Sequence, residues 1–137
     1  MILIVCLDDK NGMAFNRRRQ SRDRVLTERI RTITSGSVLW MNAYSAKLFS
    51  GGVNVDEDFM EKAGEGEYCF VETFAPELDR AEGVIIYRWN REYPADVYFT
   101  ADMSGMEIES SFEFEGSSHE CITENLFKKA VDNTGKN

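Results

Sequence analysis

A cluster of arginines surrounds one aspartate in the first quarter of the chain. Seven arginines lie between residues 17 and 31, and Asp23 stands among them. The candidates for anion binding lead into a segment with helical periodicity: Arg17, Arg18, Arg19 and Arg22. Guanidinium groups and the free backbone N–H groups of a helix N-terminus bind phosphate or carboxylate, so we expect an anion site here. A solvated helix face that binds nothing is the alternative interpretation.

Other kinds of site have weaker support. His119 is the only histidine, which excludes a multi-histidine zinc site, and Cys6, Cys69 and Cys121 show no C-x-x-C spacing. The order of residues permits a Ser-His-Asp triad, but no G-x-S-x-G motif occurs, and we interpret His119 as a cap or surface residue. The pair Asp8-Asp9 has ligands suited to magnesium, yet a solvated loop is favoured because neighbours on a strand point to opposite faces. We expect no metal site.

The charge balance indicates the class of partner. The chain has 137 residues and a formal net charge of -8, although the stretch 17–31 is positive. An acidic domain repels nucleic acid, so binding through the Arg17–Arg31 stripe is a second alternative and not the expected function. The sequence contains neither G-x-G-x-x-G nor G-x-x-x-x-G-K-[ST], the usual cradles for dinucleotides and nucleoside triphosphates.

Cysteine usage and hydropathy indicate the compartment. The three cysteines lie far apart, which fits a reducing compartment better than a disulfide framework. The apolar start, residues 1–7, is too short for the core of a signal peptide, and no stretch approaches the roughly 20 apolar residues of a membrane helix. We expect a cytoplasmic protein without membrane contact, and a single domain over residues 1–137.

Periodicity predicts the elements that hold these residues. Residues 2–7 form a continuous apolar run, which predicts a strand inside a sheet. Residues 21–34 repeat apolar side chains every three or four positions, which predicts a helix with Ser21 as its N-cap and Asp23 in its first turn. We expect further strands at 37–41, 68–72, 84–89 and 97–99, and short helices at 45–49 (capped by Ser45), 56–63 and 76–80.

The last third of the chain is richer in strands. Residues 106–114 alternate apolar or small with acidic side chains, which predicts an antiparallel strand near a sheet edge with one wet face. Residues 117–131 fit a helix, through the spacing of Ile122 and Leu126, and equally a last edge strand. The order of elements predicts an α/β fold of three layers, with a mixed, mostly parallel central sheet and antiparallel C-terminal strands.

The element order and several short motifs resemble dihydrofolate reductase. The loop at 11–16 is similar to the family's active-site loop, Val38-Leu39-Trp40-Met41 resembles its V-I-M-G strand, and 93–99 resembles its F-x-A-D-x-x-F turn. The resemblance is spread over most of the chain and implies a dihydrofolate reductase-like fold. It also places Asp23 at the position of the catalytic acid, which helps protonate a pterin ring while NADPH supplies hydride.

Departures from the family's pattern bear on activity. Arginines replace the Pro-Trp of the active-site loop, and Asn42-Ala43 replaces a Gly-Arg whose arginine holds a cofactor phosphate. Val71-Glu72 replaces the glycine pair that lets the backbone approach the nicotinamide cofactor. Side chains would fill that space, and Glu72 would face phosphate with like charge. We therefore expect no efficient hydride transfer and no cofactor.

The expected function is a small-ligand or partner-binding domain on a diverged dihydrofolate reductase-like fold. The ligand would be a small anionic or heteroaromatic molecule, or a protein partner, with Arg17 to Arg19 at the entrance of the site. The residues expected to line that site are Asn16, Asp23, Met41, Asn42 and Ser45.

The first alternative function is an NADPH-dependent reductase acting on a pterin-like substrate. Asp23 would then donate a proton through a pKa raised in an apolar pocket, and NADP(H) is expected only under this alternative. Asp23 also has a purely structural interpretation, as an acid that stabilises a helix N-terminus by at most about 1 kcal/mol.

Overall fold

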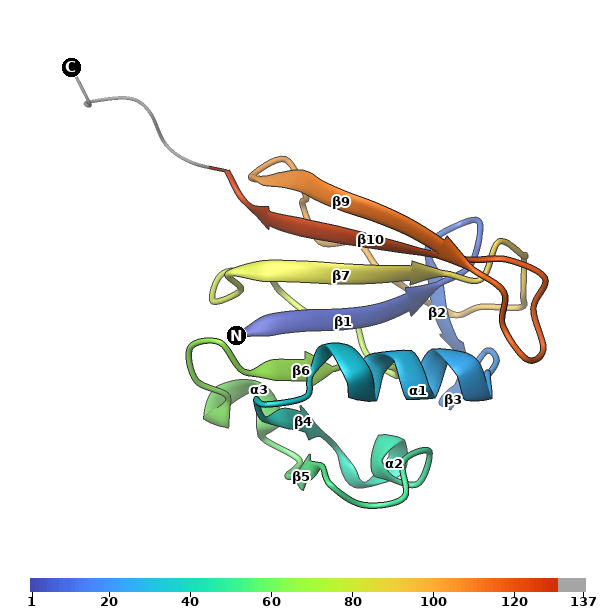
Figure 1. Cartoon of the computed structure of the whole chain (residues 1–137). Helices are drawn as coiled ribbons and strands as arrows, with labels where there is room; N and C mark the ends of the chain where they lie inside the picture. The colour runs from blue at the N-terminus through green and yellow to red at the C-terminus, as the bar shows by residue number, and fades with distance from the viewer. Residues whose placement is uncertain (131–137) are drawn as a thin grey trace.

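The computed structural model describes residues 1–130, and a seven-stranded sheet dominates it (Figure 1). Its strands are β1 (Ile2–Leu7), β4 (Leu39–Met41), β5 (Asn54–Val55), β6 (Tyr68–Phe70), β7 (Gly83–Arg88), β9 (Met106–Phe114) and β10 (Ile122–Lys129). Their order is β5-β4-β6-β1-β7-β10-β9. The strand β1 pairs in parallel with β6 and β7, whereas β10 is antiparallel to β7 and β9. The predicted mixed, mostly parallel sheet is confirmed.

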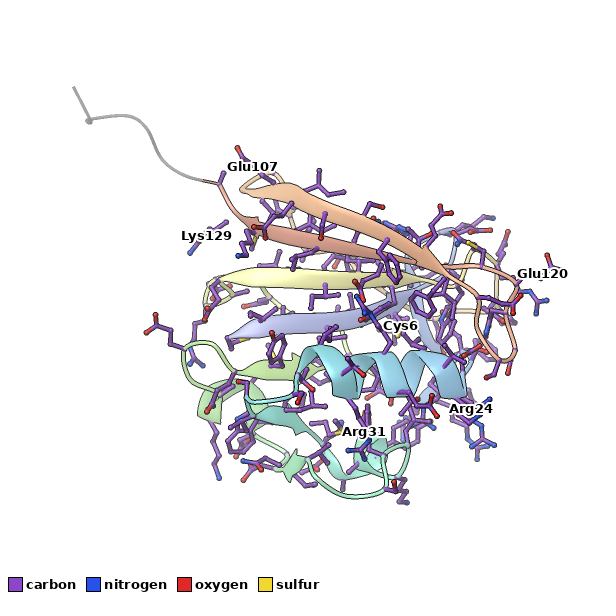
Figure 2. The ribbon with its side chains drawn as sticks, viewed as in Figure 1. Cys6, Arg24, Arg31, Glu107, Glu120 and Lys129 are labelled. Carbon is purple, nitrogen blue, oxygen red and sulfur yellow. The ribbon has the colours of Figure 1, made fainter. Side chains whose placement is uncertain are left out.

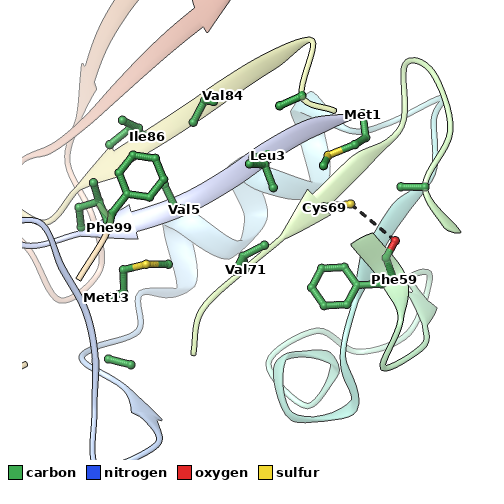
Figure 3. Packing of buried hydrophobic residues seen from close by; sticks show 14 residues of the cluster. Met1, Leu3, Val5, Met13, Phe59, Cys69, Val71, Val84, Ile86 and Phe99 are labelled. Carbon is green, nitrogen blue, oxygen red and sulfur yellow. Dashed lines mark hydrogen bonds between the residues drawn. The ribbon is translucent and has the colours of Figure 1, made fainter. Parts of the chain in front are cut away.

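Two hydrophobic clusters place other elements on the two faces of this sheet. Helix α1 (Arg24–Ile33) covers one face, where Leu26 and Ile30 pack among Ile4, Ile85 and other buried side chains. The opposite face carries α3 (Phe59–Lys62) and a small sheet of order β3-β2-β8. That sheet consists of β2 (Gly12–Phe15), β3 (Arg18–Arg19) and β8 (Val97–Tyr98). Figure 3 shows this second cluster, and the two together confirm the three layers.

Apolar character explains why the central strands form where they do. All but Ile2 and Cys6 of β1 are fully buried, and β7 is buried from Gly83 to Tyr87, because each strand has layers on both faces. Gly83 is required at the start of β7, since a Cβ there would lie 2.9 Å from the backbone oxygen of Phe127. The longest described helix, α1, has 10 residues, and no helix of residues 1–130 could cross a bilayer.

Several local predictions were wrong. Residues 11–16, expected as a loop, contain β2, which pairs with β3 and β8. Residues 76–80 form no helix.

Asp23, and not Ser21, is the N-cap of α1, because its extended backbone lets the carboxylate accept the first free N–H groups of the helix. The short helix α2 (Ala43–Ala46) is likewise capped by Asn42 and not by Ser45.

The end of the described chain is a strand, and the helix alternative for 117–131 is wrong over residues 122–129. Residue 131 lies outside the described part. The strand β10 is not at an edge, because it lies between β7 and β9, and β9 is the edge strand as predicted. The prediction that β9 has a single wet face was wrong, because its residues 107–113 are exposed on both faces. A β-bulge lies where Ser110 pairs with Leu126 and Ile108 pairs with Phe127. Because of the bulge, the side chains of Ile108 and Ser110 point to opposite faces of the sheet, whereas residues two apart on a regular strand share a face.

Candidate functional site

Asp23 is the centre of a buried cluster that joins the start of α1 to the loop before β10. Its carboxylate accepts the backbone N–H groups of Val25 and Leu26, at 3.0 and 3.3 Å, which caps the helix. It also accepts the backbone N–H groups of Ser117 and Ser118, at 2.9 and 2.8 Å. The aspartate side chain has no exposed surface. Residue 116 must be glycine, since a Cβ there would lie 2.4 Å from Asp23 Oδ2.

These contacts determine the ionisation of Asp23. Burial alone would raise the pKa of the carboxyl group, but the hydrogen bonds from His119, Ser117, Ser118 and Leu26 outweigh burial and hold the pKa well below its usual range. The direction is opposite to the raised pKa that the reductase alternative requires of Asp23. A carboxylate held in this state carries no proton to donate at neutral pH.

His119 is buried between Asp23 and two hydroxyl groups. Its Nδ1 lies 2.9 Å from Asp23 Oδ2, and its Nε2 lies 2.9 Å from Tyr93 Oη and 3.2 Å from Ser21 Oγ. The imidazole stacks on the indole of Trp89, with ring centroids 4.5 Å apart. The interpretation of His119 as a cap or surface residue is wrong, because the loop before β10 folds back over the start of α1.

Arg19 enters the interior and forms a two-point ion pair with Glu72. The Nε–Oε2 distance is 2.8 Å and the Nη2–Oε1 distance is 3.0 Å. Ser45 Oγ donates to the same carboxylate at 2.7 Å, and the guanidinium lies 4.4 Å from the ring centre of Tyr44. Burial would lower the pKa of Arg19, but its pairing with Glu72 raises the pKa overall. The sequence placed Arg19 at an entrance, and the buried countercharge of Glu72 explains why it lies inside.

Little space remains around this ion pair. A hollow of about 10 Å³ is bounded by Cys6, Met13, Arg19, Glu72, Trp89 and their neighbours. That volume suits about one water molecule. The region between the ends of β1 and β6 is therefore filled by side chains.

A cavity of about 490 Å³ lies beside α1, between the helix and residues 48–50. Asp23 is among the residues that line it. Its other walls include Arg22, Arg24, Thr27, Glu28, Arg31 and Phe49. Figure 2 labels Arg24 near the start of α1 and Arg31 nearer its end, on the side toward α2. Arg31 donates to the carbonyl of Gly51 at 2.6 Å, and its guanidinium lies 5.3 Å from the ring centre of Phe49.

The structure does not bring the predicted ligand residues together in one site. Asp23 lines the cavity beside α1, with Arg22. Met41 is fully buried in the core, and Asn42 is occupied as the cap of α2. Ser45 is bound to Glu72. Asn16 lies in a different place, at a second hollow on the side of the small sheet.

The predicted anion-binding arginines also separate. Arg22 lines the large cavity, Arg18 and Arg19 line the second hollow, and Arg17 is exposed in the turn between β2 and β3, with φ +63°. Four further residues that line the large cavity were not predicted from the sequence: Thr27, Glu28, Arg31 and Phe49. Their signal was available, since Arg24, Glu28 and Arg31 recur every three or four residues along one face of the predicted helix.

Metal binding has no visible basis in the described part of the chain. Within residues 1–130, no three side chains of His, Cys, Asp or Glu converge as ligands for an ion.

Comparisons with known proteins bear on the fold. No family model and no curated protein matches this sequence. Among solved structures, the chain is similar to a dihydrofolate reductase from Enterococcus faecalis complexed with NADP(H) and RAB-propyl. The TM-score is 0.70 over 95% of this chain and 96% of that chain, with 10% sequence identity. The predicted dihydrofolate reductase-like fold is thus confirmed, and a likeness at this identity concerns the fold alone.

Proposed function

We propose that this domain of dihydrofolate reductase-like fold binds a small anionic molecule in the cavity beside α1 and does not transfer hydride efficiently. The observation that carries the proposal is the cavity of about 490 Å³, with three arginines, Arg22, Arg24 and Arg31, on its walls. Cavities of roughly 300–1,000 Å³ hold small molecules.

The charges of the cavity favour an anion. Arginine binds carboxylate and phosphate at two points, and Arg24 is available because its one ion pair within residues 1–130, with Glu28, is highly exposed. Such exposed pairs contribute at most about 1 kcal/mol, so a ligand anion can replace the Glu28 carboxylate. The Asp23 carboxylate is already satisfied by its own hydrogen bonds and offers little repulsion.

The same cavity also has an apolar wall. Leu48 and Phe49 are the apolar residues that line it, with the Arg31 guanidinium 5.3 Å from the ring centre of Phe49. A flat ring carrying an acidic group would place the ring against this wall and the acid against α1. We therefore propose an aromatic or heteroaromatic anion as the ligand class.

The second part of the proposal is supported by the ion pair of Arg19 with Glu72. In the dihydrofolate reductase family, which the sequence resembles, a glycine pair at the place of residues 71–72 lets a nicotinamide cofactor approach. Here Val71 is buried and Glu72 is bound by Arg19 and Ser45, with about 10 Å³ of space beside them. These residues do not fit a nicotinamide ring.

We also place the domain in the cytoplasm. Cys6, Cys69 and Cys121 are all unpaired in the fold, which suits a reducing compartment.

Calorimetry and thermal melting with folate, NADPH and inorganic phosphate test the proposal. Folate, an aromatic anion, should raise the melting temperature, and a concentration 100 times Kd stabilises a protein by about 2.7 kcal/mol. Arg24→Gln with Arg31→Gln should weaken folate binding by about tenfold or more. The matched control is Arg91→Gln, an exposed arginine that does not line the cavity.

Two outcomes contradict the proposal. An unchanged melting temperature with all three compounds removes the small-ligand function. The second outcome is a loss of NADPH absorbance that depends on dihydrofolate and that Asp23→Asn abolishes. It would contradict the proposal that the domain does not transfer hydride efficiently, and would favour the reductase alternative.

A further inference from the structure

We propose that Ser21, His119 and Asp23 form a nucleophile–base–carboxylate triad that hydrolyses small esters. The contacts run in the required order, from Ser21 Oγ to His119 Nε2 at 3.2 Å and from His119 Nδ1 to Asp23 Oδ2 at 2.9 Å. An ionised carboxylate can only accept, so Nδ1 carries the ring proton of the neutral imidazole. Nε2 is then the unprotonated base, and the hydroxyl groups of Tyr93, at 2.9 Å, and of Ser21, at 3.2 Å, both lie within hydrogen-bonding distance of it.

The base and the carboxylate are held rigidly, and the nucleophile lies nearer to solvent. Asp23 is fixed by four backbone N–H groups, and the imidazole is fixed by its stack on Trp89. His119 and Asp23 are buried, whereas Ser21 is half-buried. Preorganised support of this kind is what a catalytic constellation needs.

A hollow with room for a substrate is walled by Gln20, the neighbour of Ser21 in sequence, and by Tyr93, which contacts Ser21; Ser21 itself lines the smaller hollow of about 10 Å³. The larger hollow has a volume of about 340 Å³, and its walls include Phe15, Arg18, Gln20, Tyr93 and Pro94. Tyr93 connects this hollow to the triad, because its hydroxyl lies 3.4 Å from Ser21 Oγ and 2.9 Å from His119 Nε2. When the serine attacks, Nε2 becomes protonated and stops accepting, so the Tyr93 hydroxyl is released to donate to the oxyanion that forms.

Gln20 supplies an independent indication of a ligand. Its Nε2 donates to Asp8 Oδ2 at 2.9 Å and to the carbonyl of Pro94 at 3.3 Å. Its Oε1 is buried and, within the described residues, accepts no hydrogen bond. An unsatisfied buried acceptor is costly, and a ligand N–H or O–H group would satisfy it. The substrate class is therefore a small ester that also carries a hydrogen-bond donor.

The reaction has two balanced steps. Ser21 Oγ bonds to the acyl carbon and its proton passes to His119 Nε2, and the C–O bond to the alcohol breaks as the alcohol leaves with that proton. Water then gives a proton to Nε2 while its oxygen bonds to the acyl carbon. The acyl bond to Ser21 breaks, the carboxylic acid leaves, and Nε2 returns the proton to Ser21 Oγ.

A fluorophosphonate probe and a p-nitrophenyl ester, applied to the full chain, test the triad. The wild type should gain one phosphonyl group on Ser21, located by peptide mass spectrometry. Ser21→Ala should abolish labelling and reduce ester hydrolysis by about 100-fold or more. The matched control is Ser37→Ala, which also loses a serine hydrogen bond, from Oγ to the carbonyl of Gly66 at 2.8 Å, and should behave as wild type.

Further variants separate catalysis from folding. If Ser21→Ala does not fold, Ser21→Cys keeps the size of the residue and should be alkylated by iodoacetamide faster than Cys69. His119→Gln should lose phosphonylation while a folded fraction, followed by circular dichroism, remains. A wild type without an adduct, an adduct at another residue, or equal labelling of Ser21→Ala overturns the proposal.

Discussion

The guanidinium of Arg19 and the carboxylate of Glu72 meet at two points, 2.8 and 3.0 Å apart, although 53 positions of sequence separate them. Glu72 is only 8% exposed, so the pair lies in a region from which water is largely excluded. A buried ion pair loses much of its attraction to the cost of desolvating both charges. Its main effect here is on shape, because it fills the space at the ends of β1 and β6, where a hollow of only about 10 Å³ remains.

Removing one partner of this pair should destabilise the fold strongly. Glu72→Gln leaves the Arg19 charge half-buried and unpaired, and we expect a loss of about 3 kcal/mol in the free energy of unfolding. Replacing both partners, as Arg19→Leu with Glu72→Leu, should cost less than Glu72→Gln alone. Urea denaturation measures both. Glu92→Gln, which removes the exposed pair with Lys10, should cost under about 1 kcal/mol.

Acid should weaken the wild type through Asp23. Its folded-state pKa is lowered below the value of about 3.9 in the unfolded chain, so the unfolded state binds the proton first as the pH falls. The stability from Asp23 is complete above about pH 5 and is lost progressively below about pH 4.

The variant Asp23→Asn should remove this part of the acid dependence. It should also lower the free energy of unfolding at neutral pH by about 2 kcal/mol or more, because it weakens a helix cap and several charge-assisted hydrogen bonds. Urea denaturation across the acid range compares it with Asp9→Asn, an exposed neighbour of β1. An identical pH dependence in wild type and Asp23→Asn would show that Asp23 has no such role.

Tyr87 should remain protonated until the protein unfolds. Burial, and then the hydrogen bond of its hydroxyl to Glu124 at 2.7 Å, raise the pKa of this phenol strongly. Glu124 is held in turn by Arg29, at 2.8 and 3.0 Å. Of the five tyrosines, we expect one to be missing from the alkaline titration of phenolate absorbance. Tyr87→Phe should remove the difference between native and unfolded protein, and should cost about 1–2 kcal/mol.

The thiol of Cys69 should resist alkylation in the native state. It has no exposed surface, and burial raises its pKa to about 11. Iodoacetamide at mildly alkaline pH should modify Cys69 only as fast as the protein opens, because thiolate is the reactive form. The half-buried Cys121 serves as the comparison in the same peptide maps. Modification of Cys69 as fast as Cys121 would indicate that this part of the core opens readily.

Continuous apolar runs predicted which segments form strands better than they predicted where each element begins and ends. The strands β1 and β7 follow directly from continuous apolar sequence, since layers on both faces remove the need for alternation. The strand β10 was ambiguous because Ile122 and Leu126 are four apart, which suits a helix as well as a strand. Glu124, which lies between them, is a buried acid. Its burial depends on Arg29 and Tyr87, two partners remote in sequence.

The residues of the site were harder to predict, because their contacts also join partners that are remote in sequence. The sequence identified Asp23 and the arginines as chemically important. A run of arginines does not indicate which one of them forms an ion pair with a buried acid. His119 lies 96 positions from Asp23, and only the fold of the loop before β10 brings them together. The motif resemblance gave the correct fold, while Met41, Asn42 and Ser45 took structural contacts that a family pattern does not contain.

The bulge in β9 divides the hydrophobic side chains of the edge strand. Ile108, which is 58% exposed, pairs with Phe127 on the side of α3 and the small sheet. Phe112, which is 47% exposed, lies on the side of α1, under the guanidinium of Arg29 at 4.8 Å. Glutamates at 107, 109 and 113 alternate with them along the open rim. A strand from another molecule that approached this edge would meet negative charge and no continuous apolar surface. The edge of the sheet therefore disfavours the addition of further strands.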